Sequence, residues 1–450
     1  MTLKSQMKIT ILGGGLAGSE AAWQLARRGV PVRLIEMKPN RYSPAHNSPD
    51  LGELVCSNSL RSASIGSAAG LLKEVLRELE SLIMEAADAT ALPAGKALAV
   101  QRDLFSRYIT ERILENPLVT VERGEVMQVP SKEQGIVIVA TGPLTSDALA
   151  SDITRILGIG GLSFYDAIAP IVTADSLDMD TLFRASRYSE GEGDYLNAPM
   201  DENTYRSFVR EIQNASKVDP FPFEKIPHFE GCLPVEELAR RGPDTLAFGP
   251  MKPVGLTDPS TGTRPFAVVQ LRAENRERTL YNLVGFQTKM THPEQERVFR
   301  MIPGLERAVF ARLGSIHRNT YLNAPRLLDE FSRSKKHLHV FFAGQITGVE
   351  GYIESTASGL AVGLMAGLIA CGMKPAPPPA VTAVGALLKH TRDQPAKIYE
   401  PMNVNFGIMD PAPAGTPKNR KREVLAHRAQ EAIRAWKSEM DLLWEQAEER

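Results

Sequence analysis

The chain has 450 residues, a formal net charge of −1 and 43% hydrophobic residues, an ordinary composition for a soluble globular protein. This length exceeds what one hydrophobic core usually supports, so we expect two domains or one domain with a large insertion. The near-zero charge excludes nucleic-acid binding through overall charge alone, and three cysteines argue against a disulfide framework and favour a reducing, cytoplasmic location.

The N-terminal segment predicts a dinucleotide-binding βαβ unit. Residues 8–12 are expected to form a buried strand, 16–28 a helix and 32–35 a second strand. The glycines of the intervening turn have G-x-G-x-x-G spacing, which admits a pyrophosphate at the helix N-terminus, and an acid after the second strand can bind a ribose. The residues expected to contact the cofactor are Gly13, Gly14, Gly15, Leu16, Ala17, Gly18 and Glu36.

Two later segments favour FAD as the dinucleotide. Residues 135–146 are expected to be a strand leading into an Ala-Thr-Gly turn, and residues 339–367 a strand, a glycine-rich loop and an apolar helix. In two-dinucleotide-type FAD folds the last segment contacts the flavin, with the helix N-terminus at its pyrimidine edge. The residues expected to complete the site are Ala140, Thr141, Gly142, Gly344, Gln345, Gly348, Gly351 and Tyr352.

The predicted fold class is α/β, with a Rossmann-type FAD-binding domain built from both ends of the chain and an inserted α+β domain. We expect the FAD domain to comprise residues 1–165 and 320–450, the latter ending in a helical extension, and the insertion to comprise 166–319. Within the insertion, alternating runs at 266–271 and 280–286 predict a hairpin.

The sequence predicts neither membrane association nor a metal site. The apolar run at 359–372 is shorter than the roughly 20 residues that span a bilayer, and we expect a buried helix. Glycines interrupt the N-terminal apolar run, so we expect no signal peptide.

Two of the three cysteines have neighbours suited to chemistry. Cys56 lies in ELVCSNSLRS, whereas a buried structural cysteine usually has apolar neighbours. Cys232 precedes PVEELARR, a predicted short helix whose positive end lowers the pKa of a nearby thiol; a small residue filling a turn is an equal alternative. Cys371 lies in the apolar run and is expected to pack.

Several motifs together resemble the folate- and FAD-dependent tRNA (uracil-5-)-methyltransferases. They span residues 8 to about 407 and include GGGLAG with EMKP, ELVCSNSLRS, EGCLPVEELARRG, NLVGFQTKMTHPEQ, FFAGQITGVEGYIES and PMNVNFG. The GidA-type flavoproteins that modify tRNA wobble uridine are similar more distantly. The resemblance implies an enzyme that forms 5-methyluridine at position 54 in the T arm of tRNA. It also implies 5,10-methylenetetrahydrofolate as one-carbon donor, reduced FAD as reductant and NADPH or NADH as electron source.

The resemblance also implies roles for individual residues. Cys232 is the implied nucleophile at uracil C6 and Cys56 the implied base beside the flavin, although the reverse assignment stays open. His292 and Asn323 are implied to bind folate, His292 by stacking on the pterin, with an ordinary loop histidine as the alternative. Local basic residues are the candidates for RNA contact: Arg240, Arg241, Lys335, Lys336 and 418–422. The sequence predicts no oligomeric state.

Three other functions are compatible with parts of this pattern. The same chemistry on a ribosomal RNA uridine has the same sequence requirements. A non-catalytic RNA-binding flavoprotein needs neither Cys56 nor Cys232, which counts against it. A small-molecule FAD oxidoreductase is disfavoured by the large polar insertion and by the absence of a second G-x-G-x-x-G pattern after a strand.

Overall fold

A parallel sheet forms the centre of the larger part of the molecule. The computed structural model describes residues 9–158, 162–187, 193–218, 233–397 and 399–449. In this sheet the strand order is β16-β7-β1-β2-β6, and all neighbouring strands are parallel. Its strands are short and largely buried, as expected where helices cover both faces. They are β1 (Ile9–Leu12), β2 (Val32–Glu36), β6 (Val119–Arg123), β7 (Ile136–Val139) and β16 (Val340–Phe342).

Both ends of the chain build this sheet. β16 follows the insertion by sequence but pairs with β7, and the long helix α12 (Tyr352–Ala370) packs on α2 (Leu16–Ala26). A Cβ atom at Gly359 would lie 2.2 Å from the carbonyl oxygen of Ala17, so a glycine is needed for this close approach. The predicted α/β class, with a Rossmann-type domain assembled from both chain ends, is therefore confirmed.

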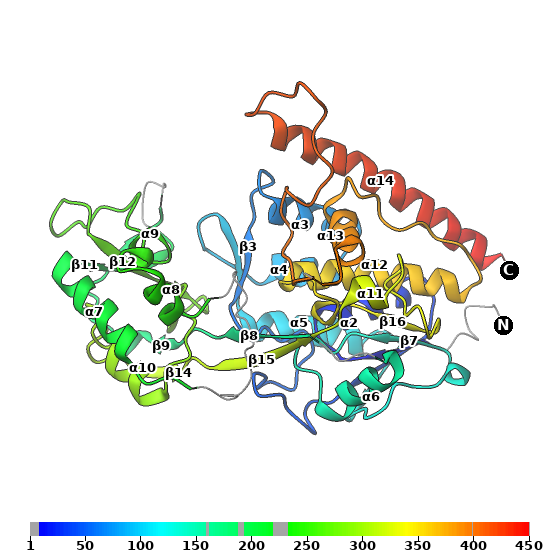
Figure 1. Cartoon of the computed structure of the whole chain (residues 1–450), viewed down its shortest axis with the longest axis horizontal. Coiled ribbons are helices and arrows are strands. Elements are labelled where there is room, and N and C mark those ends of the chain that lie inside the picture. Colours follow the sequence, from blue (N-terminus) through cyan, green and yellow to red (C-terminus); the bar gives the residue numbers. More distant parts are fainter. Residues whose placement is uncertain (1–8, 159–161, 188–192, 219–232, 398, 450) are drawn as a thin grey trace.

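Further helices and a small sheet surround this core (Figure 1). The three-stranded antiparallel sheet has the order β3-β5-β4. These elements are β3 (Ser59–Ser62), β4 (Ala91–Leu92), β5 (Ala97–Val100), α3 (Ala68–Glu78), α4 (Leu82–Ala89), α5 (Arg102–Leu114), α6 (Asp147–Leu157), α11 (Ala324–Leu327), α13 (Ala383–Asp393) and α14 (Lys421–Glu448), with 3₁₀ turns η1 (Lys132–Gln134) and η4 (Gln345–Thr347).

The inserted segment has its own antiparallel sheet and its own core. The strand order is β10-β11-β12-β13-β9-β14, and a second cluster of buried side chains draws only on residues between 172 and 310. The predicted hairpin is confirmed, because β12 and β13 pair antiparallel. The elements are β9 (Ile171–Thr173), β10 (Phe183–Ala185), β11 (Tyr195–Met200), β12 (Ala267–Ala273), β13 (Leu280–Leu283), β14 (Phe310–Arg312), η2 (Ala174–Ser176), α7 (Glu202–Asn214), α8 (Val235–Arg241), α9 (Thr245–Phe248) and α10 (His292–Phe299).

A two-stranded ribbon connects the two parts of the molecule. β8 (Leu162–Ala167) and β15 (Ile316–Tyr321) pair antiparallel, and Figure 1 shows them running between the inserted sheet on the left and the parallel sheet on the right. The expected boundaries at 165/166 and 319/320 fall within these two strands. We propose the ribbon as the junction between the domains.

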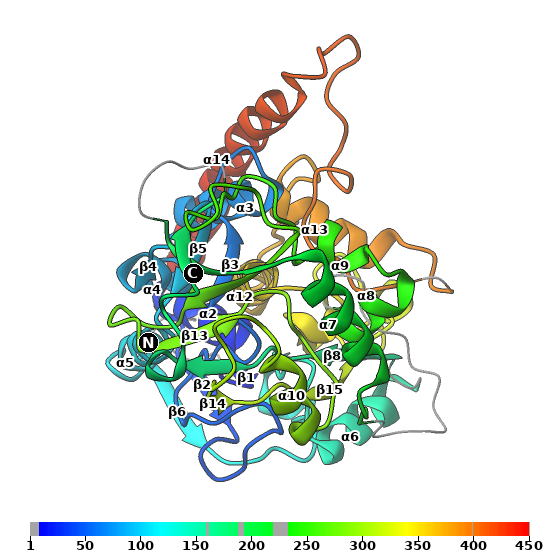
Figure 2. The same ribbon diagram turned by 90° about the vertical axis from the view of Figure 1, so that its left-hand side faces the viewer.

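Two long helices complete the fold. α12 is long and apolar enough to cross a membrane by length and composition, but 89% of its apolar window is buried inside the structure. This agrees with the predicted core helix, although the helix begins at Tyr352, earlier than the apolar run suggested. α14 contacts α3 and α12, and Figures 1 and 2 both show it along the side of the molecule opposite α6.

Candidate active site

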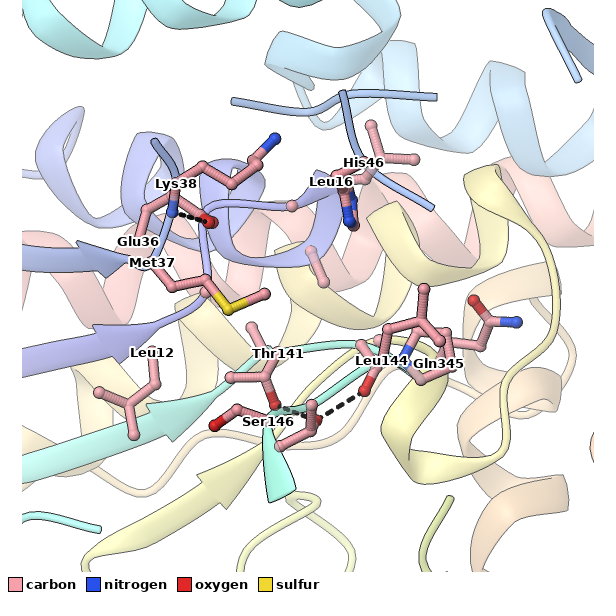
Figure 3. A pocket seen from close by; sticks show the side chains of 18 of the residues that line it. Leu12, Leu16, Glu36, Met37, Lys38, His46, Thr141, Leu144, Ser146 and Gln345 are labelled. Atoms are coloured by element: carbon pink, nitrogen blue, oxygen red, sulfur yellow. Dashed lines mark hydrogen bonds between the residues drawn. The ribbon is translucent and has the colours of Figure 1, made fainter. Parts of the chain in front are cut away.

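A first cavity lies where β1, β2 and β7 end, as expected for ligand sites in open α/β sheets. Its volume is about 160 Å3, and the N-terminal end of α2 and the loop before α12 both contribute to its wall. Figure 3 shows its labelled side chains, among which Glu36 and Gln345 come from opposite ends of the chain. Most of the predicted cofactor residues line it: Gly13, Gly15, Leu16, Ala17, Glu36, Ala140, Thr141, Gly142, Gly344, Gln345 and Tyr352.

The three glycines of the first turn differ in what surrounds them. Gly13 has a φ of +96°, which favours glycine, and a Cβ atom at Gly18 would lie 1.9 Å from the carbonyl oxygen of Gly13. A Cβ atom at Gly15, in contrast, would meet nothing within 4 Å. Gly15 caps α2 without a side-chain hydrogen bond, so the helix presents its N-terminal N–H groups at an open space. This arrangement fits a pyrophosphate.

Glu36 is buried at the edge of the same cavity. One carboxylate oxygen accepts a hydrogen bond of 2.7 Å from the backbone of Gly14, and the other accepts one of 3.0 Å from the backbone of Lys38. Each carboxylate oxygen has a second lone pair, so Glu36 can also accept from ribose hydroxyls. Gly14 therefore contributes by fixing the predicted ribose-binding acid.

Sequence reasoning missed a buried ion pair that closes one side of this cavity. The Nζ atom of Lys38 lies 3.2 Å from a carboxylate oxygen of Glu53 and donates to the carbonyl of Asp50 at 2.6 Å. His46 lies beside this pair, and burial together with the charge of Lys38 lowers its pKa. Single residues in a loop carry no periodic signal, so spacing could not have identified them.

A second cavity of about 350 Å3 adjoins the first. Cys56 lines it, together with residues of the inserted sheet and of the loop before α12. Five residues line both cavities and so mark where they meet: Val55, Pro143, Leu144, Gln345 and Tyr352. A group bound in the second cavity therefore lies next to the end of a ligand bound in the first.

The backbone around Cys56 is fixed by an aromatic hydroxyl. The hydroxyl oxygen of Tyr352 accepts hydrogen bonds from the backbone N–H groups of Cys56 and Ser57, at 2.8 and 3.2 Å. Burial raises the pKa of Tyr352 above its ordinary value, so this hydroxyl stays neutral. The thiol of Cys56 donates to the carbonyl oxygen of Ala167 at 3.8 Å.

Three arginines also hold the same loop. Arg102 donates to the carbonyl oxygens of Leu54 at 2.7 Å and Cys56 at 3.3 Å. Arg312 donates to the carbonyl oxygen of Val55 at 2.6 Å. Arg272 donates to the hydroxyl of Ser57 at 2.8 Å. Arg102 also forms a salt bridge of 2.6 Å with Glu274. Arg272 and Arg312 come from the inserted sheet, so both domains position the Cys56 loop.

The loop before α12 carries the cofactor candidates Gln345, Gly348 and Gly351. Gln345 donates to a carboxylate oxygen of Glu350 at 2.6 Å. Gly348 has a φ of +89°, and a Cβ atom there would lie 2.1 Å from the hydroxyl of Tyr399. Gly351 has a φ of +112° and lines the second cavity. These residues shape the loop before α12 so that its end meets both cavities.

The other predicted residues are distributed more widely. Cys232 lies outside the described residues. His292 is exposed at the start of α10, and Asn323 donates to the carbonyl oxygen of Ala396 at 2.7 Å; neither lines either cavity. Among the basic candidates, Lys335 and Lys336 donate to backbone carbonyl oxygens. The structure thus brings the predicted FAD residues and Cys56 together but leaves His292 and Asn323 apart from them.

The segment that follows Cys232 in the sequence is fixed beside the second cavity. Val235 donates its backbone N–H to the carbonyl oxygen of Gln287 at 2.7 Å, and Gln287 lines this cavity. The buried carboxylate of Glu236 accepts from the hydroxyl of Thr288, and Lys289 forms a salt bridge of 2.5 Å with Glu237. These contacts hold the start of α8 against the segment that follows β13.

Known proteins resemble the chain over nearly its whole length. The family model described as Glucose inhibited division protein A matches residues 8–374. A protein of Citrifermentans bemidjiense named Methylenetetrahydrofolate--tRNA-(uracil-5-)-methyltransferase TrmFO is 60% identical over 434 residues, which are 96% of this chain and 99% of that protein. A protein of the same name from Geobacter sulfurreducens is 60% identical over 95% of this chain and 98% of its own length.

Solved structures support the fold. GidA of Aquifex aeolicus, in its form I crystal, matches 95% of this chain and 76% of its own with a TM-score of 0.66 at 17% identity. Its form II crystal gives a TM-score of 0.64 over 96% of this chain and 74% of its own. Both the predicted family and the more distant GidA similarity are confirmed. The chain belongs to the family of methylenetetrahydrofolate--tRNA-(uracil-5-)-methyltransferases.

Proposed function

We propose that the protein forms 5-methyluridine at position 54 in the T arm of tRNA, with 5,10-methylenetetrahydrofolate as the one-carbon donor and FAD as the bound cofactor. The observation that carries this proposal is the position of Cys56 in the second cavity, which shares five lining residues with the first cavity. A thiol beside a redox cofactor is what reductive methylation of a uracil requires.

The residues of the first cavity fit FAD. The open N-terminus of α2 at Gly15 suits the pyrophosphate, Glu36 suits the adenosine ribose, and Gln345 with Tyr352 borders the second cavity, where the flavin end would lie. When bound here and reduced, FAD would supply the hydride that converts the transferred carbon to a methyl group. NADPH or NADH is the proposed source of electrons for the cofactor.

The proposed chemistry gives each thiol a task. The Cys232 thiolate forms a bond to uracil C6, which moves the C5=C6 electron pair toward O4 and makes C5 nucleophilic. C5 then bonds to the methylene carbon as the bond of that carbon to N10 of the folate breaks. Cys56 removes the C5 proton, and the electron pair left at C5 expels N5 of the folate and leaves an exocyclic methylene. Addition of hydride to the resulting exocyclic methylene restores C5=C6 and expels the thiolate. The exchange of the two cysteine roles is the alternative, and alanine variants of the two cysteines distinguish the two assignments.

The proposed partners are folate and the T arm of tRNA, in the cytoplasm. A uridine within a folded arm must be turned out of its stack to enter the second cavity. Phosphate contacts from surface cations would supply much of the affinity and make it salt-dependent. The proposed RNA contacts are Arg240, Arg241, Lys335, Lys336 and residues 418–422. The proposed folate-binding residues are His292 and Asn323. Because neither of these two lines a cavity, they would have to reach the folate from outside the described cavity wall.

The decisive experiment is transfer of labelled carbon. The FAD-loaded protein receives NADPH, 5,10-methylenetetrahydrofolate labelled in its methylene carbon, and an unmodified tRNA transcript. A transcript that carries cytidine at position 54 is the matched control. We expect label in 5-methyluridine at position 54 of the first transcript alone. Label in ribosomal RNA but not in tRNA would change the substrate, and label in neither would contradict the proposal.

A further inference from the structure

Asn282 is a buried polar residue of the second cavity with an unused hydrogen-bond donor. It lies in β13, only 2% of its surface is exposed, and it lines the cavity. Its side-chain nitrogen has no hydrogen-bond partner among the described residues. Burying an amide donor without a partner is unfavourable, and most buried polar groups in proteins are therefore paired.

A second asparagine in the same sheet shows the usual arrangement. Asn197 lies in β11 and is fully buried. Its side-chain nitrogen donates to the carbonyl oxygens of Phe183, Ala185 and Tyr195 at 3.2, 3.0 and 3.2 Å. The inserted sheet can thus satisfy a buried asparagine completely, and Asn282 differs because its amide faces a cavity instead of backbone.

The neighbour of Asn282 across the sheet is a buried cation. Arg272 in β12 is directly opposite Asn282 in the strand register and also lines the cavity. Arg272 is 6% exposed, and its hydrogen bonds to Asn58 and Ser57, at 2.7 and 2.8 Å, involve neutral groups. Burial lowers its pKa from the ordinary value. The wall that carries Asn282 therefore places an amide beside a guanidinium, and both groups can donate hydrogen bonds to a carbonyl group of a ligand.

We propose that Asn282 determines specificity by binding the lactam edge, –C(=O)–NH–, of a planar ring substrate in the second cavity. An asparagine amide offers one donor for the ring carbonyl and one acceptor for the adjacent ring N–H, which matches such an edge in both groups. The uracil of the RNA and the pterin of the folate both carry this edge. This assignment rests on the proposed methyltransferase function and extends it to the residue that reads the substrate.

The test uses Asn282→Leu in the FAD-loaded full chain. Because leucine has a similar volume and no unpaired donor, the melting temperature should stay the same or rise. The KM of the substrate whose lactam edge Asn282 binds should rise at least about ten-fold, because the polar groups of that edge then lose their partner in a buried site. Titration of tRNA at saturating folate, and of folate at saturating tRNA, distinguishes the two sources: a rise for tRNA alone assigns uracil, and a rise for folate alone assigns pterin.

Two further variants make the outcome unambiguous. Asn282→Asp keeps the size of the side chain but replaces the amide donor by a second acceptor, so it should be as defective as Asn282→Leu and serves if that variant does not fold. Asn197→Leu should lower the melting temperature and leave both KM values unchanged. Wild-type KM values in both Asn282 variants would overturn the assignment, whereas a wild-type protein that transfers no label would instead overturn the proposed function.

Discussion

The hydroxyl of Tyr352 lies 2.8 Å from the backbone nitrogen of Cys56, although 296 positions separate the two residues in the sequence. Tyr352 begins α12, in the C-terminal part of the parallel-sheet domain, and Cys56 lies in the N-terminal part. The contact therefore connects Tyr352, which lines both cavities, to the backbone of the loop that carries a proposed catalytic thiol.

Replacing Tyr352 by phenylalanine removes the acceptor for two backbone donors. We expect a loss of about 1–3 kcal/mol in the free energy of unfolding, because the N–H groups of Cys56 and Ser57 become unpaired. The kcat of methylation should fall as the thiol loses its fixed position, and unfolding with urea and steady-state kinetics measure the two effects. Tyr205→Phe is the matched control, since its buried hydroxyl accepts from Ala247 and donates to Pro243 inside the inserted domain. It should lower stability and leave kcat unchanged; equal kcat losses in both variants would contradict a specific role for Tyr352.

The first-turn glycines should separate cofactor binding from folding. In Gly15→Ala the new methyl group enters open space, so the cofactor-free protein should unfold at the wild-type temperature while its affinity for FAD falls at least about ten-fold, by steric exclusion of the ligand. In Gly18→Ala the methyl group meets the Gly13 carbonyl, so the cofactor-free protein itself should be destabilised. Calorimetry without FAD and flavin fluorescence titration give the two readouts. Wild-type FAD affinity in Gly15→Ala would exclude the proposed pyrophosphate position.

The cysteines should have different phenotypes with an RNA that contains 5-fluorouridine. Cys232→Ala should retain the yellow flavin and lose the covalent RNA adduct, because no thiolate adds at C6. Cys56→Ala should still form the adduct but methylate ordinary tRNA at least about 100-fold more slowly, since a proton-transfer group is missing. Denaturing gels detect the adduct, and Cys371→Ala, a buried change at the end of α12, is the control. The opposite pattern would exchange the two roles.

A buried lysine should give the stability of the protein a distinct dependence on pH. Lys73 is fully buried in α3, and burial lowers its pKa from 10.5 to about 8; the charged groups that act on it are Glu354, Arg61, Arg77 and Glu74. Between these two pKa values the unfolded chain binds more protons than the folded one. The contribution of Lys73 to the free energy of unfolding therefore increases as the pH rises through this range.

Lys73→Met removes this gain. The stability of the variant relative to wild type should therefore fall by roughly 3 kcal/mol between about pH 7.5 and pH 10.5, because one pKa unit corresponds to about 1.4 kcal/mol. Urea unfolding at intervals across this range measures the difference. Lys418→Met, at an exposed position, should give a curve parallel to that of wild type, and a parallel curve for Lys73→Met would show that the lysine is not perturbed.

The sequence predicted those parts of the site that depend on short-range geometry. The glycines between Gly13 and Gly18, and Glu36 eighteen residues later, belong to one βαβ unit whose strand and helix periods fix their positions. The segment before α12 was also predicted, because a strand, a glycine-rich loop and an apolar helix follow one another directly. In these cases local periodicity determines which residues line the first cavity.

The contacts around Cys56 could not be predicted in this way. Arg312 reaches Val55 and Arg272 reaches Ser57 across more than 200 positions, and only the folded ribbon and sheet bring them together. Asn282 was part of a recognised motif, but its unused donor depends on which face of β13 meets the cavity. A lone arginine or asparagine carries no periodic signal, so only the three-dimensional structure shows what it contacts.

The ribbon formed by β8 and β15 places the inserted domain in the middle of the chain, and this has a consequence for biosynthesis. β16 and α12 complete the dinucleotide-type fold, yet both are translated after the whole insertion. The glycines of α12 can contact α2 only after residues 359–367 have been made, which is after the whole insertion. On the ribosome the inserted segment, with a core of its own, is therefore free to fold first, and the nascent chain gains a complete cofactor pocket only after that segment has been made.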